Sequence, residues 1–288
     1  MKQLNQFITE YIVKKKLDKF VDSEDHYKYC PKTKIELVRN IKELFDKNET
    51  DLNCIDVSNI TDMSHLFESC EGYPYINFDV SRWDVSNVTN MRYIFNNCTS
   101  FKGKGLENWN VSNVTNMTYM FNNCNNFNND LSNWDVSNVT NMDRMFKSCE
   151  NFEGKGIENW NVSKVKDMTV MFYKCKKLNC DLSKWNVSNV ESMYYMFGDC
   201  YNFNCDLSKW NVSKVEDMTR MFQGCKKFTG KGLENWDVGN VKYTKYMFFE
   251  CTNFNCDLSN WNVSKFENMS NMFYGCIALE NKPSWYKK

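Results

Sequence analysis

Cysteine is the residue type in this sequence with the greatest potential for chemistry. The chain of 288 residues has 14 cysteines but only two histidines, His26 and His65. Clustered thiolates bind zinc, and a cysteine paired with a histidine can act as a nucleophile. Two histidines cannot supply a histidine-based ligand set or a catalytic triad. Any site chemistry must therefore come from the cysteines or from carboxylates.

The cysteines fall into two columns of a repeated segment. Cys180, Cys205 and Cys256 form the second column, each five residues after a member of the first. A four-thiolate zinc site from Cys175, Cys180, Cys200 and Cys205 is conceivable across adjacent segments. However, Asn129 and the lysines of Gly-Lys-Gly inserts take the second column elsewhere, so no ligand set repeats. We therefore expect reduced thiols, no metal and no cofactor. The first column occupies an apolar position, where cysteine acts as a small hydrophobic residue: Cys70, Cys98, Cys124, Cys149, Cys175, Cys200, Cys225, Cys251 and Cys276.

The carboxylates are also repeated rather than singular. Acid–base catalysis needs one carboxyl group in a distinctive environment. Here aspartate and asparagine exchange freely in the column Asp84, Asn110, Asp135, Asn161, Asn186, Asn211, Asp237 and Asn262. This interchange indicates a structural role, and the sequence predicts that the protein is not an enzyme.

Stepping from these columns to the elements that carry them, a tryptophan recurs every 25 or 26 residues and a cysteine follows it by fifteen. The tryptophans are Trp83, Trp109, Trp134, Trp160, Trp185, Trp210, Trp236 and Trp261. Ile55 and Cys70 mark an earlier copy, which gives nine modules, and Trp285 begins a truncated tenth. Long modules carry a Gly-Lys-Gly insert (103–105, 154–156 and 230–232), whereas short ones resemble Asn129-Asp130-Leu131-Ser132.

Two periodicities alternate within a module. Leu131, Trp134 and Val136 follow the spacing of leucine-rich repeats and predict a short strand. Further on, apolar residues at 142, 145, 146 and 149 predict one face of a short helix that begins after Asn141 as its N-cap. Equivalent caps are Asp62, Asn90, Asn116, Asp167, Ser192, Asp217 and Asn268, while Tyr243 followed by Thr244 suggests a local irregularity. Such modules bury their apolar faces only by stacking. The fold class is therefore an α/β repeat solenoid, leucine-rich-repeat-like, with one short parallel strand and one short helix per module.

The ends of the chain differ from the repeat. Residues 1–53 contain two helical patterns, one around Leu4–Ile12 and one around Leu37–Phe45, the second preceded by the capping box Thr33-x-x-Glu36. We interpret 1–53 as a helical N-terminal cap, with a separate functional domain as the alternative. Residues 54–282 form the nine-module solenoid, and 283–288 form a C-terminal end with the truncated repeat.

The module sequence resembles a known family. Blocks such as Trp134-Asp135-Val136-Ser137-Asn138-Val139-Thr140-Asn141-Met142, followed by Met145-Phe146 and Cys149, closely resemble the BspA-like bacterial surface proteins, over roughly residues 51–285. This resemblance implies a leucine-rich-repeat-like fold and a role in adhesion. It also makes a cell-surface location an expectation, although no signal peptide or anchor is visible and the default location is cytoplasmic.

In the leucine-rich-repeat frame, polar residues beside each tryptophan point outward on the concave side. They form either hydrogen-bonded ladders or an extended binding surface. Variable positions that we place on the convex side, such as Arg144, Tyr173, Tyr194, Tyr195 and Arg220, are the alternative surface. The candidate partner-binding residues are Arg82, Asp84, Asn108, Asn110, Asn133, Asp135, Asn159, Asn161, Lys184, Asn186, Lys209, Asn211, Asn235 and Asp237.

Composition narrows the partners further. The 36 basic and 36 acidic residues give a formal net charge of zero, so no nucleic-acid partner is expected. No stretch approaches the ~18 apolar residues of a membrane span. The sequence thus predicts a non-enzymatic, adhesion-type scaffold that binds a protein or a glycan. An intracellular bacterial or viral scaffold that binds host or self proteins is the alternative.

Overall fold

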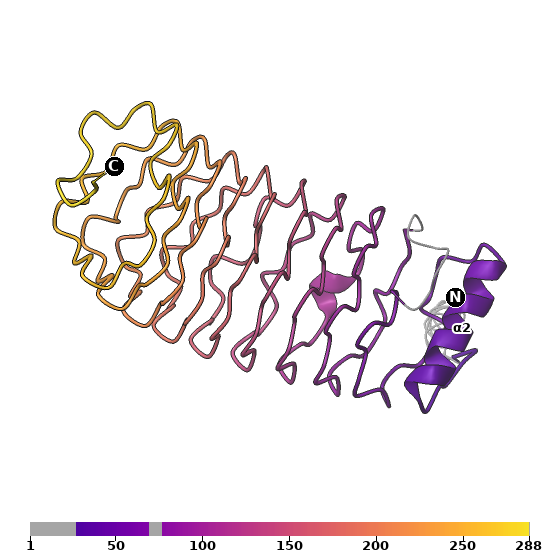
Figure 1. Cartoon of the computed structure of the whole chain (residues 1–288). Helices are drawn as coiled ribbons and strands as arrows, with labels where there is room; N and C mark the ends of the chain where they lie inside the picture. Colours follow the sequence, from indigo (N-terminus) through magenta and orange to yellow (C-terminus); the bar gives the residue numbers. More distant parts are fainter. Residues whose placement is uncertain (1–26, 69–76, 288) are drawn as a thin grey trace, which may run out of the picture.

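The chain forms a curved repeat solenoid in which successive modules lie side by side (Figure 1). The computed structural model describes residues 27–68 and 77–287. We number the modules 1 to 10 by the residue in the tryptophan column, from Ile55 to Trp285. Each module closes one turn of the solenoid and packs against the module before it and the module after it.

The segment from Asn141 to Cys149 and its equivalents, which we call the turn ribbon, connects neighbouring modules. Alternate amides of the ribbon donate to the next module: Met142 to Asp167 at 3.1 Å, Arg144 to Thr169 at 2.9 Å and Phe146 to Met171 at 2.9 Å. A parallel bridge joins each ribbon start to the next, from Asp62↔Asn90 to Tyr243↔Asn268. Between these bonds the ribbon closes consecutive three-residue turns, such as Met145 N–H to the Met142 carbonyl at 3.1 Å.

The predicted helix and strand of each module are therefore wrong, although the parallel stacking is present. In the described residues the ribbon contains turns rather than a helix, and no extended strand follows the tryptophans. The reason is a left-handed residue at two places per ribbon, for example Arg144 with φ 53° and Ser148 with φ 60°. A left-handed residue at the third place of a turn ends helical propagation and frees alternate amides for the neighbouring module. The expected N-caps instead form the bridges.

The expected irregularity at Tyr243 and Thr244 is not observed. The bridge Tyr243↔Asn268 continues the ladder. Thr244 is fully buried, and both its amide and its hydroxyl donate to the Asn268 carbonyl, at 3.2 and 3.1 Å. The Thr244 hydroxyl thus forms a hydrogen bond at the buried position that other modules fill with a methionine.

Stacked aromatic columns fill the core. Phenylalanines of successive ribbons stack with ring centroids 5.3–5.8 Å apart, as in Phe67–Phe95 and Phe222–Phe248. Tryptophans stack at 6.2–6.5 Å, as in Trp83–Trp109 and Trp160–Trp185. Rings at the ribbon surface lie closer still, with Tyr93–Tyr119 at 4.3 Å. Because the spacing grows from ribbon to tryptophan, the array bends with the tryptophans outermost.

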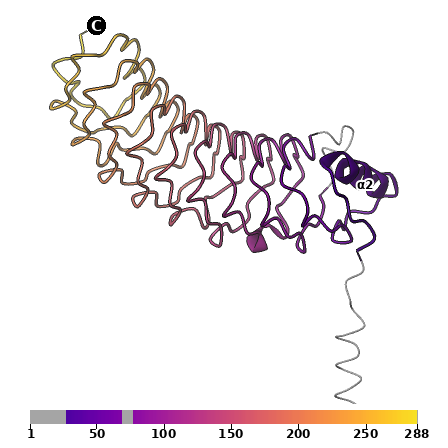
Figure 2. The same cartoon turned by 90° about the horizontal axis from the view of Figure 1, so that it is seen from below.

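Figure 2 shows this bend, and the 3-10 turn η1 (Leu106–Asn108) lies on its outer edge. We call the tryptophan side the outer face and the ribbon surface the inner face. A bulky column on one side and close contacts on the other generate the curvature.

Helix α2 (Lys34–Asp46) covers the N-terminal end of the array (Figures 1 and 2). Thr33 accepts from the Glu36 amide at 3.2 Å, as the capping box predicts, while Glu36 accepts from the Lys32 amide at 2.7 Å. The helix buries Leu37, Ile41, Leu44 and Phe45. The pattern around Leu4–Ile12 lies outside the described residues.

Candidate interaction surface

The predicted partner-binding residues are all exposed, but they lie on the convex face and not on the concave face expected from the sequence. Residues immediately before and after each tryptophan are exposed throughout modules 2 to 8. They flank the outermost ring column, and Asn108 belongs to the turn on the outer edge of the bend. The leucine-rich-repeat frame placed them on the concave side because it assumed a strand at the tryptophans. Without that strand, these residues occupy the convex side.

The column after the tryptophan has a backbone role. The Asp135 carboxylate accepts from the Ser137 amide at 3.0 Å, and Asn161 accepts in the same way from Ser163 at 3.2 Å. The same contact recurs at Asp84, Asn110, Asn186, Asn211, Asp237 and Asn262. Aspartate and asparagine both close this turn, which explains their interchange. These bonds lie within modules, so the column is not a ladder between modules.

A ladder between modules does exist at the position directly after the serine of this turn. The carboxamide of Asn138 donates to the Ser112 carbonyl of the preceding module at 2.8 Å, and Lys164 donates to Asn138 at 2.7 Å. The column before the tryptophan is less engaged, with Lys184 bound to Asn159 at 2.9 Å and Asn133 bound to the Glu107 carbonyl at 3.1 Å. The outer face is thus largely occupied by its own hydrogen bonds.

The inner face carries a run of stacked tyrosines and cations. Arg144 lies over the Tyr119 ring at 5.2 Å, and Tyr119 stacks on Tyr93. Farther along, Lys174 lies over Tyr173 at 5.0 Å. At the position that directly follows the ribbon, Lys226 lies over Tyr201 at 5.2 Å. Stacking on aromatic rings fixes the cations without neutralising them. Arg144 is also paired with the Asp143 carboxylate at 2.7 Å, whereas Lys174 and Lys226 form no ion pair within the described residues. Tyrosine and arginine are also the residue types enriched at the centres of binding interfaces.

Tyr195 is the centre of this run. Its ring lies 4.4 Å from Tyr173 and 5.6 Å from the Arg220 guanidinium, and its hydroxyl accepts from Gln223 at 3.0 Å. Gly198 makes room for it, since a Cβ there would lie 2.2 Å from the ring. Burial raises the pKa of the Tyr195 hydroxyl. Tyr195 is therefore a rigid, neutral anchor in the middle of the array.

Asp199 is a half-buried carboxylate beside this anchor. Burial raises its pKa above the usual value, although the nearby Lys174 opposes the shift. Gly224 leaves space for it, because a Cβ there would lie 2.3 Å from the carboxylate. A carboxylate kept at an energetic cost beside stacked cations is a feature of functional surfaces.

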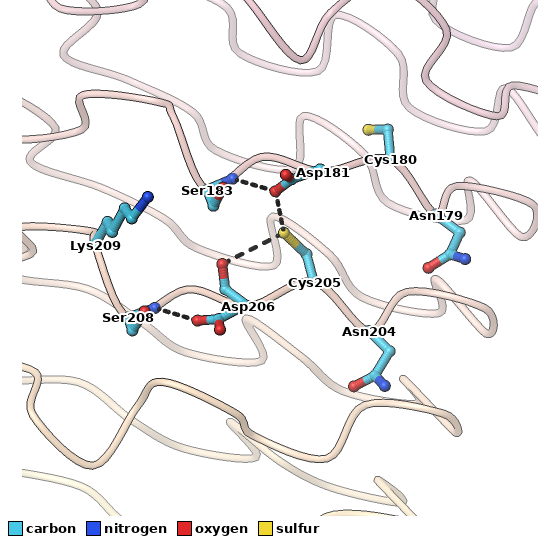
Figure 3. Close-up of a pocket in the computed structure, with 9 residues that line it drawn as sticks. All are labelled: Asn179, Cys180, Asp181, Ser183, Asn204, Cys205, Asp206, Ser208 and Lys209. Atoms are coloured by element: carbon cyan, nitrogen blue, oxygen red, sulfur yellow. Dashed lines mark hydrogen bonds between the residues drawn. The ribbon is translucent and has the colours of Figure 1, made fainter.

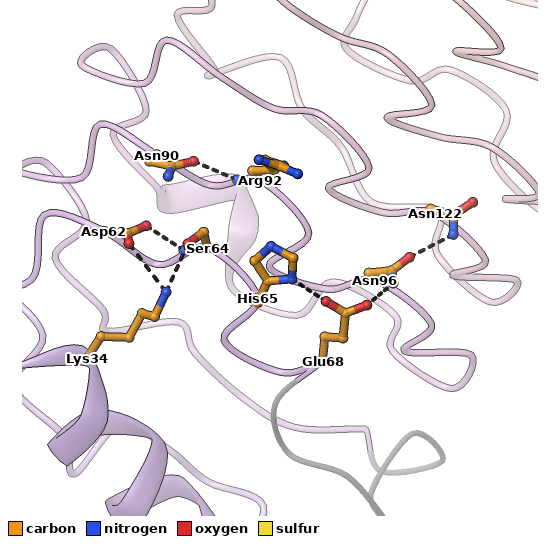
Figure 4. Close-up of polar contacts among 9 residues, drawn as sticks. All are labelled: Lys34, Asp62, Ser64, His65, Glu68, Asn90, Arg92, Asn96 and Asn122. Carbon is orange, nitrogen blue, oxygen red and sulfur yellow. Dashed lines mark hydrogen bonds and ion pairs between the residues drawn. The ribbon is translucent and has the colours of Figure 1, made fainter.

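At its N-terminal end the inner face begins with a polar network (Figure 4). Lys34 of α2 binds Asp62 at 3.3 Å and Ser64 at 2.9 Å. His65 contacts Glu68, which accepts from Asn96 at 2.6 Å. The carboxamides of Asn96 and Asn122 continue the chain at 2.7 Å. The Lys34 contacts join the helical cap to module 1, and the separate Glu68–Asn96–Asn122 contacts join modules 1 to 3.

The first cysteine column has a second role besides packing. The Cys149 thiol donates to the Phe121 carbonyl of the preceding module at 3.0 Å, and Cys200 donates to Phe172 at 2.9 Å. Burial raises the pKa of both thiols well above 9. Within the described part of the chain, every cysteine is a free thiol and no three Cys, His, Asp or Glu side chains are placed to hold a metal ion. The absence of a metal stays a prediction, and Cys70 lies outside the described residues.

Sequence reasoning named Arg144, Tyr173, Tyr194, Tyr195 and Arg220 but placed them on the convex side. The structure places their ribbon on the inner face. The structure also shows residues of the same stacks that the sequence did not single out, namely Tyr93, Tyr119, Lys174, Lys226 and Tyr246. Sequence variation between modules could have identified the inner face. The residue type two positions after the ribbon methionine changes from module to module, whereas the residues beside the tryptophan change little.

Comparisons with known proteins give little beyond the family. No curated protein matches the chain. Among solved structures, the TLR13 chain of the TLR13-ssRNA13 complex aligns over 86% of this chain at 10% identity, with a TM-score of 0.24. A leucine-rich-repeat protein of Leptospira interrogans aligns over 75% of this chain and 72% of its own at 9% identity, with a TM-score of 0.17. The present chain spans 48% of the TLR13 chain. Such low TM-scores support no argument about fold or function.

Two further findings concern the array as a whole. In the described residues no helix is long and apolar enough to cross a membrane. The family model described as "Mycoplasma protein of unknown function, DUF285" matches residues 37–157, 140–231 and 230–287. These matches cover the modules almost from end to end, and the chain belongs to this family.

Proposed function

We propose that the chain is a non-enzymatic scaffold that binds a protein partner through its inner face, centred on Tyr195. The observation that carries this proposal is the run of tyrosines and stacked cations across modules 3 to 8. Rigid aromatic side chains lose little conformational entropy on binding, and pre-ordered cations add specificity. The outer face supports the proposal by contrast, since its repeated polar groups are engaged within the chain.

The resemblance to BspA-like proteins favours an adhesin whose partner lies on a cell surface. An intracellular scaffold is the second candidate, and a glycan is the alternative ligand. The reduced, deeply buried cysteines favour the intracellular candidate, since a free thiol column is typical of a reducing compartment. The exclusion of nucleic acid stays a prediction, because the inner face carries several cations although the chain is neutral.

The test is affinity capture with the full chain, followed by quantitative mass spectrometry. Surface extracts, cytosol, a glycan array and a single-stranded oligonucleotide are probed in parallel. The variant Tyr195→Ala/Arg220→Ala is expected to lose the enriched partner at least tenfold. The outer-face variant Arg82→Ala/Lys184→Ala is the matched control and is expected to retain it. Retention by the first variant and loss by the second would refute the inner face as the binding surface.

A further inference from the structure

A groove of about 390 Å³ lies between modules 6 and 7, on the side of the tryptophan column. Its lining includes Cys180, Asp181, Ser183, Cys205, Ser208 and Lys209 (Figure 3). The volume is within the range of small-ligand sites, which begins at about 300 Å³. Among modules 3 to 9, modules 6 and 7 are the two consecutive short ones. The groove therefore lies where a Gly-Lys-Gly insert is absent.

Elsewhere, the insert lysine fills the equivalent place. Lys155 of module 5 binds Asp130 of module 4 at 2.9 Å, and Lys231 of module 8 binds Asp206 of module 7 at 2.9 Å. Lys104 of module 3 binds Asp79 of module 2 at 2.5 Å. Each aspartate uses Oδ1 for the amide two residues later and Oδ2 for the lysine. The chain thus builds the same ammonium site three times.

Asp181 has the same geometry without the lysine. Its Oδ1 accepts from the Ser183 amide at 2.9 Å, as in the other three sites. Within the described residues no ion pair reaches its Oδ2, because module 7 has no insert. Nearby Lys184 is bound to Asn159, and Lys209 forms no ion pair in the described part of the chain. Asp181 lines the groove, and the partners of its carboxylate within the described residues, the Ser183 amide and the Cys205 thiol, both contact Oδ1.

Cys205 replaces the backbone acceptor that the insert supplies, but not the lysine charge. The insert carbonyl of Lys155 accepts from the Leu131 amide at 3.2 Å, and that of Lys231 accepts from Leu207 at 3.2 Å. In module 6 the Leu182 amide donates to the Cys205 sulfur at 3.1 Å instead. The cysteine therefore completes the backbone without supplying the positive charge.

We propose that this groove binds a primary alkylammonium group on Asp181 Oδ2, in the place that the insert lysines fill at the other junctions. An ammonium offers three donors, and the hydroxyls of Ser183 and Ser208 line the same groove. The group can come from a lysine side chain of a polypeptide or from a free diamine. The site lies on the outer face and does not depend on the inner-face function proposed above.

The test titrates the full chain with the blocked tripeptide Ac-Gly-Lys-Gly-NH₂, which copies the insert, and with cadaverine as the free diamine. Amide resonances of Leu182 and Ser183 report binding. Asp181→Asn removes the charge but retains the turn, since asparagine closes a turn of the same type after the tryptophan, at Asn161. Asp257→Asn is the charge-matched control, because Asp257 closes an equivalent turn at Ser259. Urea midpoints verify that both variants are folded.

We expect saturable shifts that Asp181→Asn and acetylation of the peptide amine each weaken at least tenfold, and that Asp257→Asn does not change. Lys231→Ala, which frees Asp206, is expected to create a second set of shifts at Leu207 and Ser208. Tighter binding of the tripeptide assigns the site to polypeptide lysines, and equal or tighter binding of cadaverine assigns it to free amines. Unchanged binding by Asp181→Asn, or equal binding of the acetylated peptide, would overturn the proposal.

Discussion

The indole, thiol and carboxamide columns supply hydrogen bonds that a turn-rich backbone would otherwise lack. Each tryptophan Nε1 donates to a carbonyl of the preceding module, for example Trp160 to Leu131 at 3.2 Å and Trp285 to Leu258 at 2.9 Å. The cysteine thiols satisfy phenylalanine carbonyls in the same way. Because buried carbonyls without donors are costly, these columns explain why specific residue types recur where size alone would admit several.

The tryptophan column allows packing and hydrogen bonding to be separated. Trp160→Ala is expected to lower the free energy of unfolding by about 3–5 kcal/mol, as for other large core truncations. Trp160→Phe retains much of the packing but leaves the Leu131 carbonyl without its donor, at a cost of about 1–3 kcal/mol. Urea titration measures both, with the exposed neighbour Asn159→Ala as control. Equal losses for the alanine and phenylalanine variants would assign the whole effect to the hydrogen bond.

The cysteines are expected to be reduced and free of metal, and those of the buried first column are expected to be unreactive in the folded chain. Burial raises the pKa of Cys149, Cys200 and Cys251 well above 9, so few thiolates are present at neutral pH. A thiol reagent should label this column only after denaturation, when all 14 cysteines titrate. Elemental analysis and thermal melts with and without a chelator test the metal. Stoichiometric zinc with a large chelator-induced loss of stability would refute the expectation.

Asp199 gives a pH-dependent prediction. Burial raises its pKa in the folded chain above the unfolded value, so the folded state binds the proton more tightly. The contribution of Asp199 to stability therefore falls as the pH rises from the pKa of the unfolded chain through the higher pKa of the folded chain. Asp199→Asn should raise stability at pH 7, by less than about 1 kcal/mol after solvent screening, and should change nothing near pH 3. Urea midpoints at the two pH values measure the difference, and destabilisation at pH 7 would contradict it.

At the scale of the element, the sequence predicted register better than conformation. The columns of tryptophan, methionine, phenylalanine and cysteine stack as expected, because their spacing sets which residues meet. The helix at 142–149 was wrong, since an i, i+3, i+4, i+7 pattern also arises from consecutive turns. Left-handed residues distinguish consecutive turns from a helix. Here they include Tyr195, Val170 and Arg220, whose residue types do not predict a left-handed conformation. The candidate partner-binding residues were placed on the concave side for the same reason, because a helix and a strand were assumed in each module.

Glycines of the insert test whether its conformation is obligatory. Gly156 has φ 89°, and a Cβ there would lie 2.2 Å from the Ser132 backbone nitrogen. Gly156→Ala is therefore expected to cost more than about 2 kcal/mol, through strain and a backbone clash.

Gly239 provides the matched control, because serine holds its place in the other modules and its φ is not left-handed. Gly239→Ser should leave the urea midpoint within about 0.5 kcal/mol of the parent value. Similar losses for the two substitutions would show that the insert backbone is not specifically strained.

For the whole molecule, the inter-module ladder has a direction. In the ribbons of modules 2 to 8, four alternate amides donate to carbonyls of the next module. In module 9 the equivalent amides of Met269, Asn271, Phe273 and Gly275 have no acceptor within the described residues. Two copies related by a two-fold axis would bring donors against donors at this edge. A two-fold pairing of this edge with itself would therefore lack ladder hydrogen bonds.

This polarity predicts a gradient of local stability along the array. Repeat arrays are stabilised by nearest-neighbour contacts, so a ribbon that is hydrogen-bonded to one neighbouring ribbon opens more readily than one bonded to two. The amides of Met269, Asn271, Phe273 and Gly275 should exchange with solvent on the order of 100-fold faster than those of Met142, Arg144, Phe146 and Ser148. Residue-resolved hydrogen exchange makes the comparison within one sample, because both sets occupy the same ribbon positions. Repeating it at two protein concentrations controls for self-association. Equal protection of the two sets at both concentrations would show that module 9 is as firmly held as the interior, against the nearest-neighbour description of this solenoid.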